Sequence, residues 1–230
     1  MKNSPLASLL EKNPRIETVE MVLTDLNGIY RGKWVPVGAA KKVLDGKFKI
    51  PLTAVSPDIW GRDVPSLCEK TGDGDGICEA IEETARLLPW LSRPTAQVFL
   101  QLNLEDGTPW AFDPRVVLKN VYDRFRAKGL KPVCAPELEF YLFGENRDRD
   151  GKPRIPATRV NGQCQIGGQL YSTEVMQETA TLMHEIRETC EQMSVPLDGL
   201  LKELAPGQYE LNLHHVDDPL HAADNAQLLK

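Results

Sequence analysis

The segment Ala135-Pro-Glu-Leu-Glu-Phe-Tyr-Leu-Phe143 carries two carboxylates, two positions apart, in an apolar run. The run predicts a strand over 132–143, and residues two apart on a strand point to one face. Glu137 and Glu139 are therefore expected to project together. Neighbouring carboxylates repel each other unless a cation holds them, and oxygen ligands suit hard ions such as Mg²⁺ or Mn²⁺. A solvated polar face on an antiparallel strand is the simpler explanation of the same pattern.

A second acidic pair lies downstream, in Glu203-Leu-Ala-Pro-Gly-Gln-Tyr-Glu210. Its Pro-Gly step predicts a turn that bends the backbone back. Glu203 and Glu210 are then expected to approach one site. Beyond the turn, Glu210, Asn212 and His214 share one face of the next strand.

The rest of the sequence predicts an α+β protein in which the hydrophobic period changes after Glu105-Asp106-Gly107. The expected elements are strands 16–25 and 30–37 with a hairpin at Asn27-Gly28, a helix over 38–45, strands near 50–56 and 96–104, a helix over 114–128, the strand 132–143, a polar excursion over 144–170, a helix over 173–193, two further strands, and a helix that begins at Pro219.

The helix over 114–128 has clear start and stop signals. Asp113 is a good N-cap, Pro114 suits the first helical position, and Gly129 ends the pattern. Its expected apolar face consists of Val117, Leu118, Val121, Tyr122 and Phe125.

Composition restricts the class of protein. The formal charge of −6 argues against a general nucleic-acid or anionic-membrane binder. The sequence has no apolar run near the ~20 residues of a membrane span, and its N-terminus does not resemble a signal peptide. The five cysteines form no CxxC pair. Reduced thiols and a cytoplasmic location are therefore expected.

The two acidic motifs together resemble the metal-binding core of glutamine synthetases. Pro-Glu-x-Glu-Phe-x-Leu-Phe precedes Glu-x-x-Pro-Gly-Gln-x-Glu, and Asp106–Arg115 (DGTPWAFDPR) resembles the family's approach to its first catalytic-domain helix. The resemblance covers about residues 96–230. It implies a β-grasp N-terminal domain over 1–105, followed by the first portion of the catalytic α/β domain over 106–230.

The resemblance also implies a set of metal ligands. Glu139, Glu203 and Glu210 would hold one Mg²⁺ or Mn²⁺ ion near the glutamate and the γ-phosphate of ATP. Glu137 would hold a second ion by the ATP phosphates. Of these residues, Glu139 and Glu203 are the catalytic candidates.

Nucleotide contacts and assembly are expected from the same resemblance. Asp198 stands where the family has an acidic residue near ATP, and Leu213, His214 and His215 follow the strand that lies along the nucleotide. The family implies a homo-oligomer with active sites between subunits, and small-molecule substrates: glutamate, an amine and ATP.

The identity of the amine depends on the N-terminal part. Leu23–Lys33 (LTDLNGIYRGK) resembles family members that glutamylate polyamines. Ordinary glutamine synthetases carry Asp-Gly-Ser-Ser, whose aspartate helps to bind ammonium, where this chain has Ser56–Asp63 (SPDIWGRD). Asp58 is placed at the aspartate's position, in the amine region, and Trp60 is either part of an apolar amine site or a packing residue. A polyamine such as putrescine is the expected acceptor, and ammonia is the alternative.

Several parts of the family's machinery have no counterpart in these 230 residues. The histidine metal ligand, the phosphate-binding arginines and a last metal-binding glutamate are not found, and the pattern at 217–230 has a helix start but no helix stop. A chain cut within a helix is therefore expected, and it is predicted to be inactive alone. The rival interpretation is a non-catalytic protein that binds metal and oligomerises.

Overall fold

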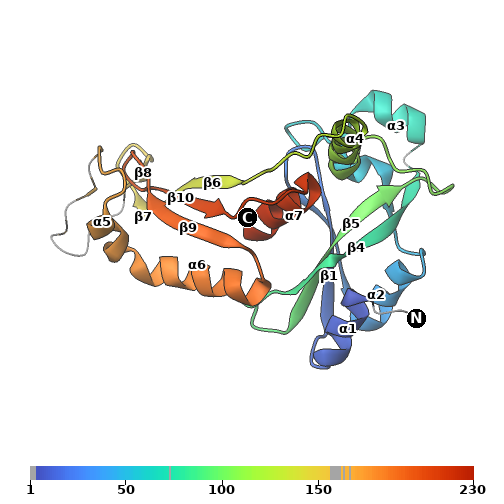
Figure 1. Cartoon of the computed structure of the whole chain (residues 1–230), viewed down its shortest axis with the longest axis horizontal. Coiled ribbons are helices and arrows are strands. Elements are labelled where there is room, and N and C mark those ends of the chain that lie inside the picture. Colours follow the sequence, from blue (N-terminus) through green and yellow to red (C-terminus); the bar gives the residue numbers. More distant parts are fainter. Residues whose placement is uncertain (1–3, 73, 156–161, 163, 166) are drawn as a thin grey trace. The chain divides into compact units, whose positions relative to one another are not determined.

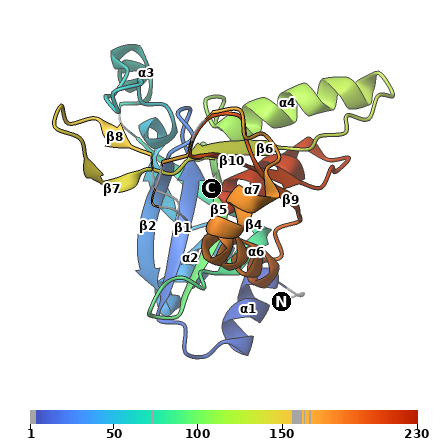
Figure 2. The same cartoon turned by 90° about the vertical axis from the view of Figure 1, so that its left-hand side faces the viewer.

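The structure is a computed structural model that describes residues 4–72, 74–155, 162, 164–165 and 167–230. It mixes helices and strands and divides into two compact units, Met1–Lys131 and Pro132–Lys230. Each unit has its own sheet (Figures 1 and 2).

The first unit is built on a five-stranded sheet with the order β2-β1-β5-β4-β3. Its strands are β1 (Thr18–Thr24), β2 (Tyr30–Pro36), β3 (Lys49–Pro51), β4 (Asp75–Leu87) and β5 (Thr95–Asn103). The β1–β5 pair is parallel and the other pairs are antiparallel, so the sheet is mixed.

Two helices bury one face of this sheet, α1 (Pro5–Lys12) and α2 (Val37–Leu44). Leu6 of α1 and Ala40 of α2 are fully buried in a cluster with Val19 and Met21 of β1 and Val98 of β5. The core therefore lies between the helices and the sheet. The predicted hairpin, the helix over 38–45 and the strand over 96–104 are confirmed, and Gly28 supplies the positive φ of 73° in the hairpin loop.

Three features of the first unit differ from the sequence prediction. The strand expected over 50–56 is wrong beyond Pro51, because the chain turns into a 3₁₀ helix, η1 (Leu52–Val55). Strand β4 was not predicted, since its pairing register shifts between Ile81 and Arg86 and its alternation is broken there. Helices α1 and α3 (Pro65–Thr71) were also not predicted.

The helix predicted over 114–128 is present as α4 (Pro114–Ala127), with Asp113 accepting the N–H of Arg115 at 2.8 Å. Burial raises the pKa of Asp113. The predicted apolar face of α4 is not part of the core, because Val117 and Val121 on this face are 45% and 42% exposed.

The second unit contains a three-stranded antiparallel sheet with the order β6-β10-β9. Its strands are β6 (Glu137–Tyr141), β9 (Leu197–Lys202) and β10 (Gln208–Leu213). The strand predicted over 132–143 is shorter than expected, since Pro136 has no N–H for the ladder and Cys134 forms only an isolated bridge with Val216.

Helices α5 (Thr173–Glu178) and α6 (Ala180–Met193) pack against β9 (Figures 1 and 2). The single helix expected over 173–193 is therefore two helices, separated at Thr179. The helix expected at Pro219 is present as α7 (Pro219–Leu229), with Asp218 as its N-cap. Within the polar stretch 144–170 the structure has β7 (Gly144–Arg147) and β8 (Pro153–Arg154), and positions 156–161, 163 and 166 lie outside the described residues.

Within the described part of the chain, no helix combines the length and the apolar character needed to cross a membrane.

Candidate active site

The register of the β6–β10 pair determines the arrangement of the acidic residues. Glu210 lies directly opposite Glu139, and Asn212 lies opposite Glu137. Directly opposed residues have Cβ atoms about 4.5–5.5 Å apart and point to one face. The predicted shared face of Glu137 and Glu139 is therefore present, and a carboxylate from the next strand joins it.

The opposite face of the same sheet is apolar and buried. Tyr209, Leu211 and Leu213 of β10 are 1%, 7% and 2% exposed. This alternation fixes the register, because a slip by one residue would bury the glutamates. The side chain of Leu213 thus belongs to the packed face.

Glu203 follows β9 at the start of a tight turn. Its N–H donates to the carbonyl of Gln208 at 3.0 Å, and its own Oε2 accepts the N–H of Leu204 at 3.0 Å. Gly207 allows the turn, since it has φ of 71° and a Cβ there would come 2.6 Å from the carbonyl oxygen of Leu142. The predicted turn is confirmed, and it places Glu203 beside the strand that carries Glu210.

Neutral amides hydrogen-bond two of the site's carboxylates. Gln208 Nε2 donates to Glu139 Oε2 at 2.5 Å, and Asn212 Nδ2 donates to Glu210 Oε1 at 2.7 Å. Among the described residues, no three His, Cys, Asp or Glu side chains are gathered closely enough to hold a metal ion. The backbone brings together the donor chemistry that suits Mg²⁺ or Mn²⁺, and the carboxylates of Glu139, Glu203 and Glu210 each have a hydrogen-bond partner within the protein.

Lys202 is a feature that sequence reasoning missed. It is fully buried beneath the turn, and its Nζ donates to the carbonyls of Glu203 and Ala205, each at 2.6 Å. The ammonium also lies 5.5 Å from the ring centroid of Tyr209. Burial lowers the pKa of Lys202. The available signal was its inward position in the strand, next to Glu203.

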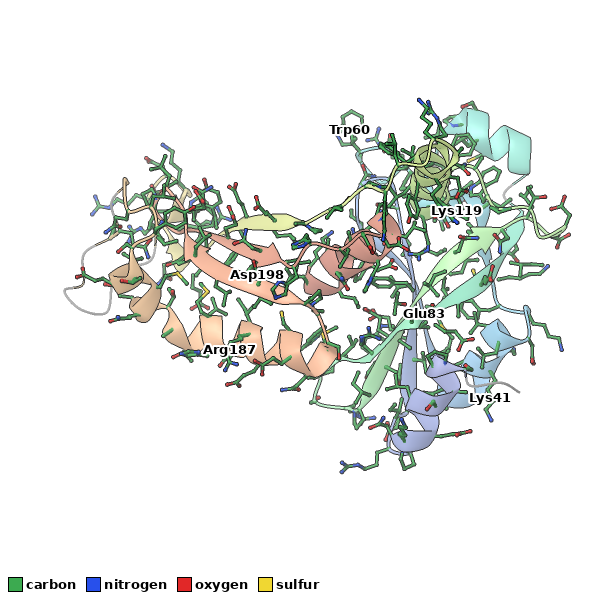
Figure 3. All side chains as sticks on the ribbon, in the orientation of Figure 1. Lys41, Trp60, Glu83, Lys119, Arg187 and Asp198 are labelled. Carbon is green, nitrogen blue, oxygen red and sulfur yellow. The ribbon has the colours of Figure 1, made fainter. Side chains whose placement is uncertain are left out.

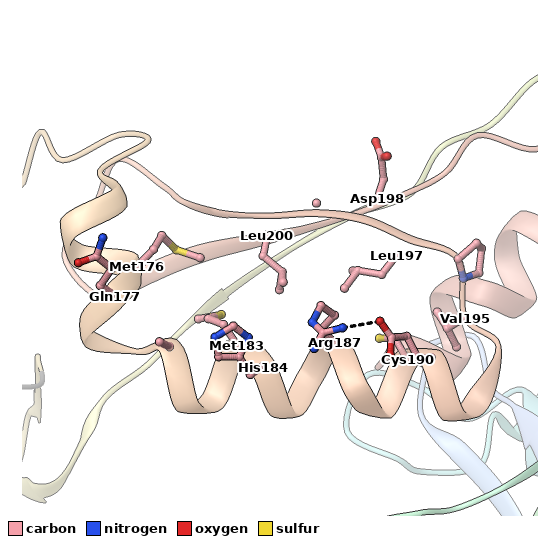
Figure 4. A pocket seen from close by; sticks show the side chains of 14 residues that line it. Met176, Gln177, Met183, His184, Arg187, Cys190, Val195, Leu197, Asp198 and Leu200 are labelled. Atoms are coloured by element: carbon pink, nitrogen blue, oxygen red, sulfur yellow. Dashed lines mark hydrogen bonds and ion pairs between the residues drawn. The ribbon is translucent and has the colours of Figure 1, made fainter.

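The residues predicted to lie near the nucleotide are partly brought together. Asp198 Oδ1 and His214 Nδ1 are 3.1 Å apart, and both side chains are more than half exposed. Figure 4 shows Asp198 pointing away from α6. His215 is exposed next to this pair. The structure thus forms a carboxylate–histidine pair where β9 begins and β10 ends.

Asp58 belongs to the first unit, where it organises its own loop. Its Oδ1 accepts the N–H groups of Trp60 and Arg62 at 2.8 and 2.9 Å, and Asn27 Nδ2 donates to its carbonyl at 3.0 Å. Trp60 is 73% exposed and extends into solvent (Figure 3). Trp60 is thus not a core residue, and the Asp58 carboxylate has a structural role that the sequence did not indicate.

A groove of about 580 Å³ runs between α6 and β9 (Figure 4). Met183, Cys190 and Leu200 are among its apolar lining residues, and Arg187 and Glu191 form an ion pair along it. Of the predicted site residues, only Asp198 lines this groove. The groove is therefore separate from the acidic face.

Comparison with known proteins gives a consistent family assignment. The family model of the glutamine synthetase catalytic domain matches residues 111–230. The chain is 36% identical to the gamma-glutamylputrescine synthetase PuuA of Escherichia coli (strain K12), over 96% of this chain and 47% of that protein. It is 30% identical to a glutamate–isopropylamine ligase of Pseudomonas sp, over 96% of this chain and 48% of that protein.

Solved structures share the fold. The structure titled "GmaS/ADP complex-Conformation 1" superposes with a TM-score of 0.75 at 22% identity, over 99% of this chain and 47% of that chain. The glutamine synthetase of Plasmodium falciparum superposes with a TM-score of 0.72 at 18% identity, over 100% and 48% of the two chains. This chain spans about half the length of the curated relatives described above. It belongs to the glutamine synthetase family, whose catalytic-domain model it matches from residue 111 to residue 230.

Proposed function

We propose that this chain is the first half of an ATP-dependent ligase that joins the γ-carboxylate of L-glutamate to an amine. The observation that carries the proposal is the acidic face of the second unit, on which Glu139 and Glu210 oppose each other within the matched catalytic-domain region. A carboxylate is a poor electrophile, so it first takes the γ-phosphoryl group of ATP, which releases ADP. The amine then attacks the resulting γ-glutamyl phosphate and displaces inorganic phosphate.

The acidic residues have distinct roles in this proposal. Glu139, Glu203 and Glu210 hold one divalent cation, Mg²⁺ or Mn²⁺, and Glu137 holds a second. When bound, the ions neutralise the phosphoryl oxygens as charge develops on them. Asp198, Leu213, His214 and His215 lie along the nucleotide, with Leu213 contributing through its main chain because its side chain is buried.

The proposed amine is putrescine or another polyamine. Support comes from the 36% identity to a gamma-glutamylputrescine synthetase, together with the Leu23–Lys33 segment. Ammonia is the alternative acceptor, favoured by the acidic side chain of Asp58 in the amine region.

We also propose how the parts are organised. Residues 1–105 form a β-grasp domain, which the mixed five-stranded sheet packed under α1 and α2 supports, and residues 106–230 begin the catalytic domain. The complete enzyme is a homo-oligomer in which the N-terminal domain of one subunit covers the catalytic domain of the next.

The test is ADP formation by the protein expressed from its complete reading frame. We expect ADP release to require glutamate, to rise when an amine is added, and to yield a γ-glutamylamide by mass spectrometry. Glu210→Gln is expected to lose this activity, whereas Glu145→Gln, on exposed β7, retains it. The 230-residue chain alone is expected to be inactive, since the phosphate-binding arginines that the family resemblance implies have no counterpart in it. ADP release that ignores glutamate would reject the proposal.

A further inference from the structure

The side chain of Gln208 connects the Glu203 turn to the strand that carries Glu139. Its Oε1 accepts the N–H of Ala205 at 3.0 Å, and its Nε2 donates to Glu139 Oε2 at 2.5 Å. The main chain of the same residue accepts from Glu203 and donates to Ala205, at 3.0 and 3.1 Å. One residue thus closes the turn and reaches across to the neighbouring strand.

The chemistry of the two partners fixes the orientation of the amide. The N–H of Ala205 requires an acceptor, and the Glu139 carboxylate accepts but cannot donate while it is ionised. Gln208 satisfies both partners in one orientation only, with its oxygen towards the turn and its nitrogen towards the carboxylate. A glutamate would repel Glu139, and an apolar side chain would satisfy neither partner.

The underside of the turn is held by other groups. Lys202 Nζ donates to the carbonyls of Glu203 and Ala205, and Gln165 accepts the N–H of Gly207 at 2.9 Å. Gln165 also donates to the hydroxyl of Tyr209 at 2.9 Å. The turn therefore has supports that do not involve Gln208, and the bond to Glu139 is the contribution of Gln208 to the acidic face.

We infer that Gln208 is a positioning residue that couples the turn carrying Glu203 to Glu139, so that these carboxylates converge on one divalent cation when it binds. The inference rests on the proposed function. The amide nitrogen of Gln208 occupies one carboxylate oxygen of Glu139 and leaves the other oxygen for the ion. It also reduces the repulsion between Glu139 and Glu210 before an ion binds. Hydrogen-bond partners of this kind typically contribute a factor of 10–100 to metal affinity.

The experiment measures Mn²⁺ affinity of the 230-residue chain by electron paramagnetic resonance. Gln208→Met keeps the side-chain length but removes both hydrogen bonds, and we expect about tenfold or more weaker binding. Gln208→Ser, which reaches neither partner, gives the same readout should the methionine variant not fold. The comparison variants are Glu139→Ala, Glu203→Ala and Glu210→Ala, each expected to weaken binding at least about tenfold.

A double-mutant cycle separates positioning from general loosening of the turn. If Gln208 acts through Glu139, Gln208→Met changes Mn²⁺ affinity less than about twofold in the Glu139→Ala background. An equal loss in both backgrounds would overturn the coupling. Normal affinity in Gln208→Met, with loss in the glutamate variants, would overturn the inference and leave the metal site standing. Two results would overturn the inference and the proposed metal site together. These are the absence of Mn²⁺ binding by the unsubstituted chain and normal Mn²⁺ binding in all three glutamate variants.

Discussion

Asp25 is a buried carboxylate that holds the hairpin loop between β1 and β2. Its Oδ1 accepts the N–H groups of Asn27 and Ile29 at 2.8 and 2.9 Å, and its Oδ2 accepts Nε of Arg31 at 2.9 Å. Its side chain is fully buried. Because Asp25→Ala would leave these donors without their acceptor, we expect it to lower the free energy of unfolding by about 2–3 kcal/mol. Urea denaturation followed by circular dichroism measures this change.

Asp58 provides the matched control for that substitution. It makes the same pair of loop hydrogen bonds, to the N–H groups of Trp60 and Arg62, but in an exposed loop. Water replaces these bonds when they are lost, so Asp58→Ala is expected to cost less than about 1 kcal/mol. Equal losses in the two variants would contradict the role assigned to burial at Asp25.

Sequence reasoning at the residue scale succeeded where a period of two decides orientation. The shared face of Glu137 and Glu139 follows from strand geometry alone. The buried position of Lys202 was missed, although its place in the strand indicates an inward side chain, because lysine is rarely buried and its acceptors here are carbonyls that converge only once the turn has formed. The bond from Gln208 to Glu139 depends on the pairing of two strands separated by about 70 residues of chain, which no local pattern reports.

At the scale of elements, α4 shows an apolar stripe without a buried partner. Val116 is 4% exposed, whereas Val121 and Phe125 are 42% and 41% exposed. We therefore expect Val121→Gln and Phe125→Gln to change the free energy of unfolding of this chain by no more than about 0.5 kcal/mol each. Val116→Ala, the control, is expected to cost at least about 1 kcal/mol. Thermal unfolding of the three variants decides the matter, and large losses at Val121 and Phe125 would show that the stripe is covered in solution.

The prediction of elements succeeded where termination signals are local. Asp113 with Pro114 located the start of α4, and Asn27-Gly28 located the hairpin. It failed where tertiary pairing overrides the local pattern. Strand β4 keeps its place beside β5 in spite of a register shift, and Thr179 interrupts an apolar repeat that reads as one continuous helix.

At the scale of the whole molecule, the proposed chemistry and the proposed choice of amine belong to different parts of the chain. The acidic face lies within residues 111–230, which the family model matches, whereas Leu23–Lys33 and Ser56–Asp63 precede that region. In the structure these two segments meet, since Asn27 Nδ2 donates to the carbonyls of Pro57 and Asp58. Sequence comparison therefore supports the ligase reaction more directly than it supports the amine.

Ammonia and a polyamine require different acceptor sites. An ammonium site closes anionic or carbonyl groups around one nitrogen. A polyamine site needs an apolar channel for the methylenes and an acid near the second ammonium. The loop that carries Asp58 presents Ile59 and Trp60 at 76% and 73% exposure, and these side chains offer the apolar surface that methylenes require.

We therefore expect the complete enzyme to prefer putrescine, or a longer polyamine, over ammonia by at least ~30-fold in kcat/KM. Each buried methylene contributes about 0.8 kcal/mol, so four methylenes give roughly 3 kcal/mol when fully desolvated. At ~1.4 kcal/mol per tenfold this is about a hundredfold, and partial hydration of the chain reduces it. Steady-state rates with the two amines at fixed ATP and glutamate measure the ratio, and Trp60→Ala is expected to reduce it. Equal rates, or a preference for ammonia, would identify the Ser56–Asp63 loop as structural and the enzyme as an ordinary glutamine synthetase.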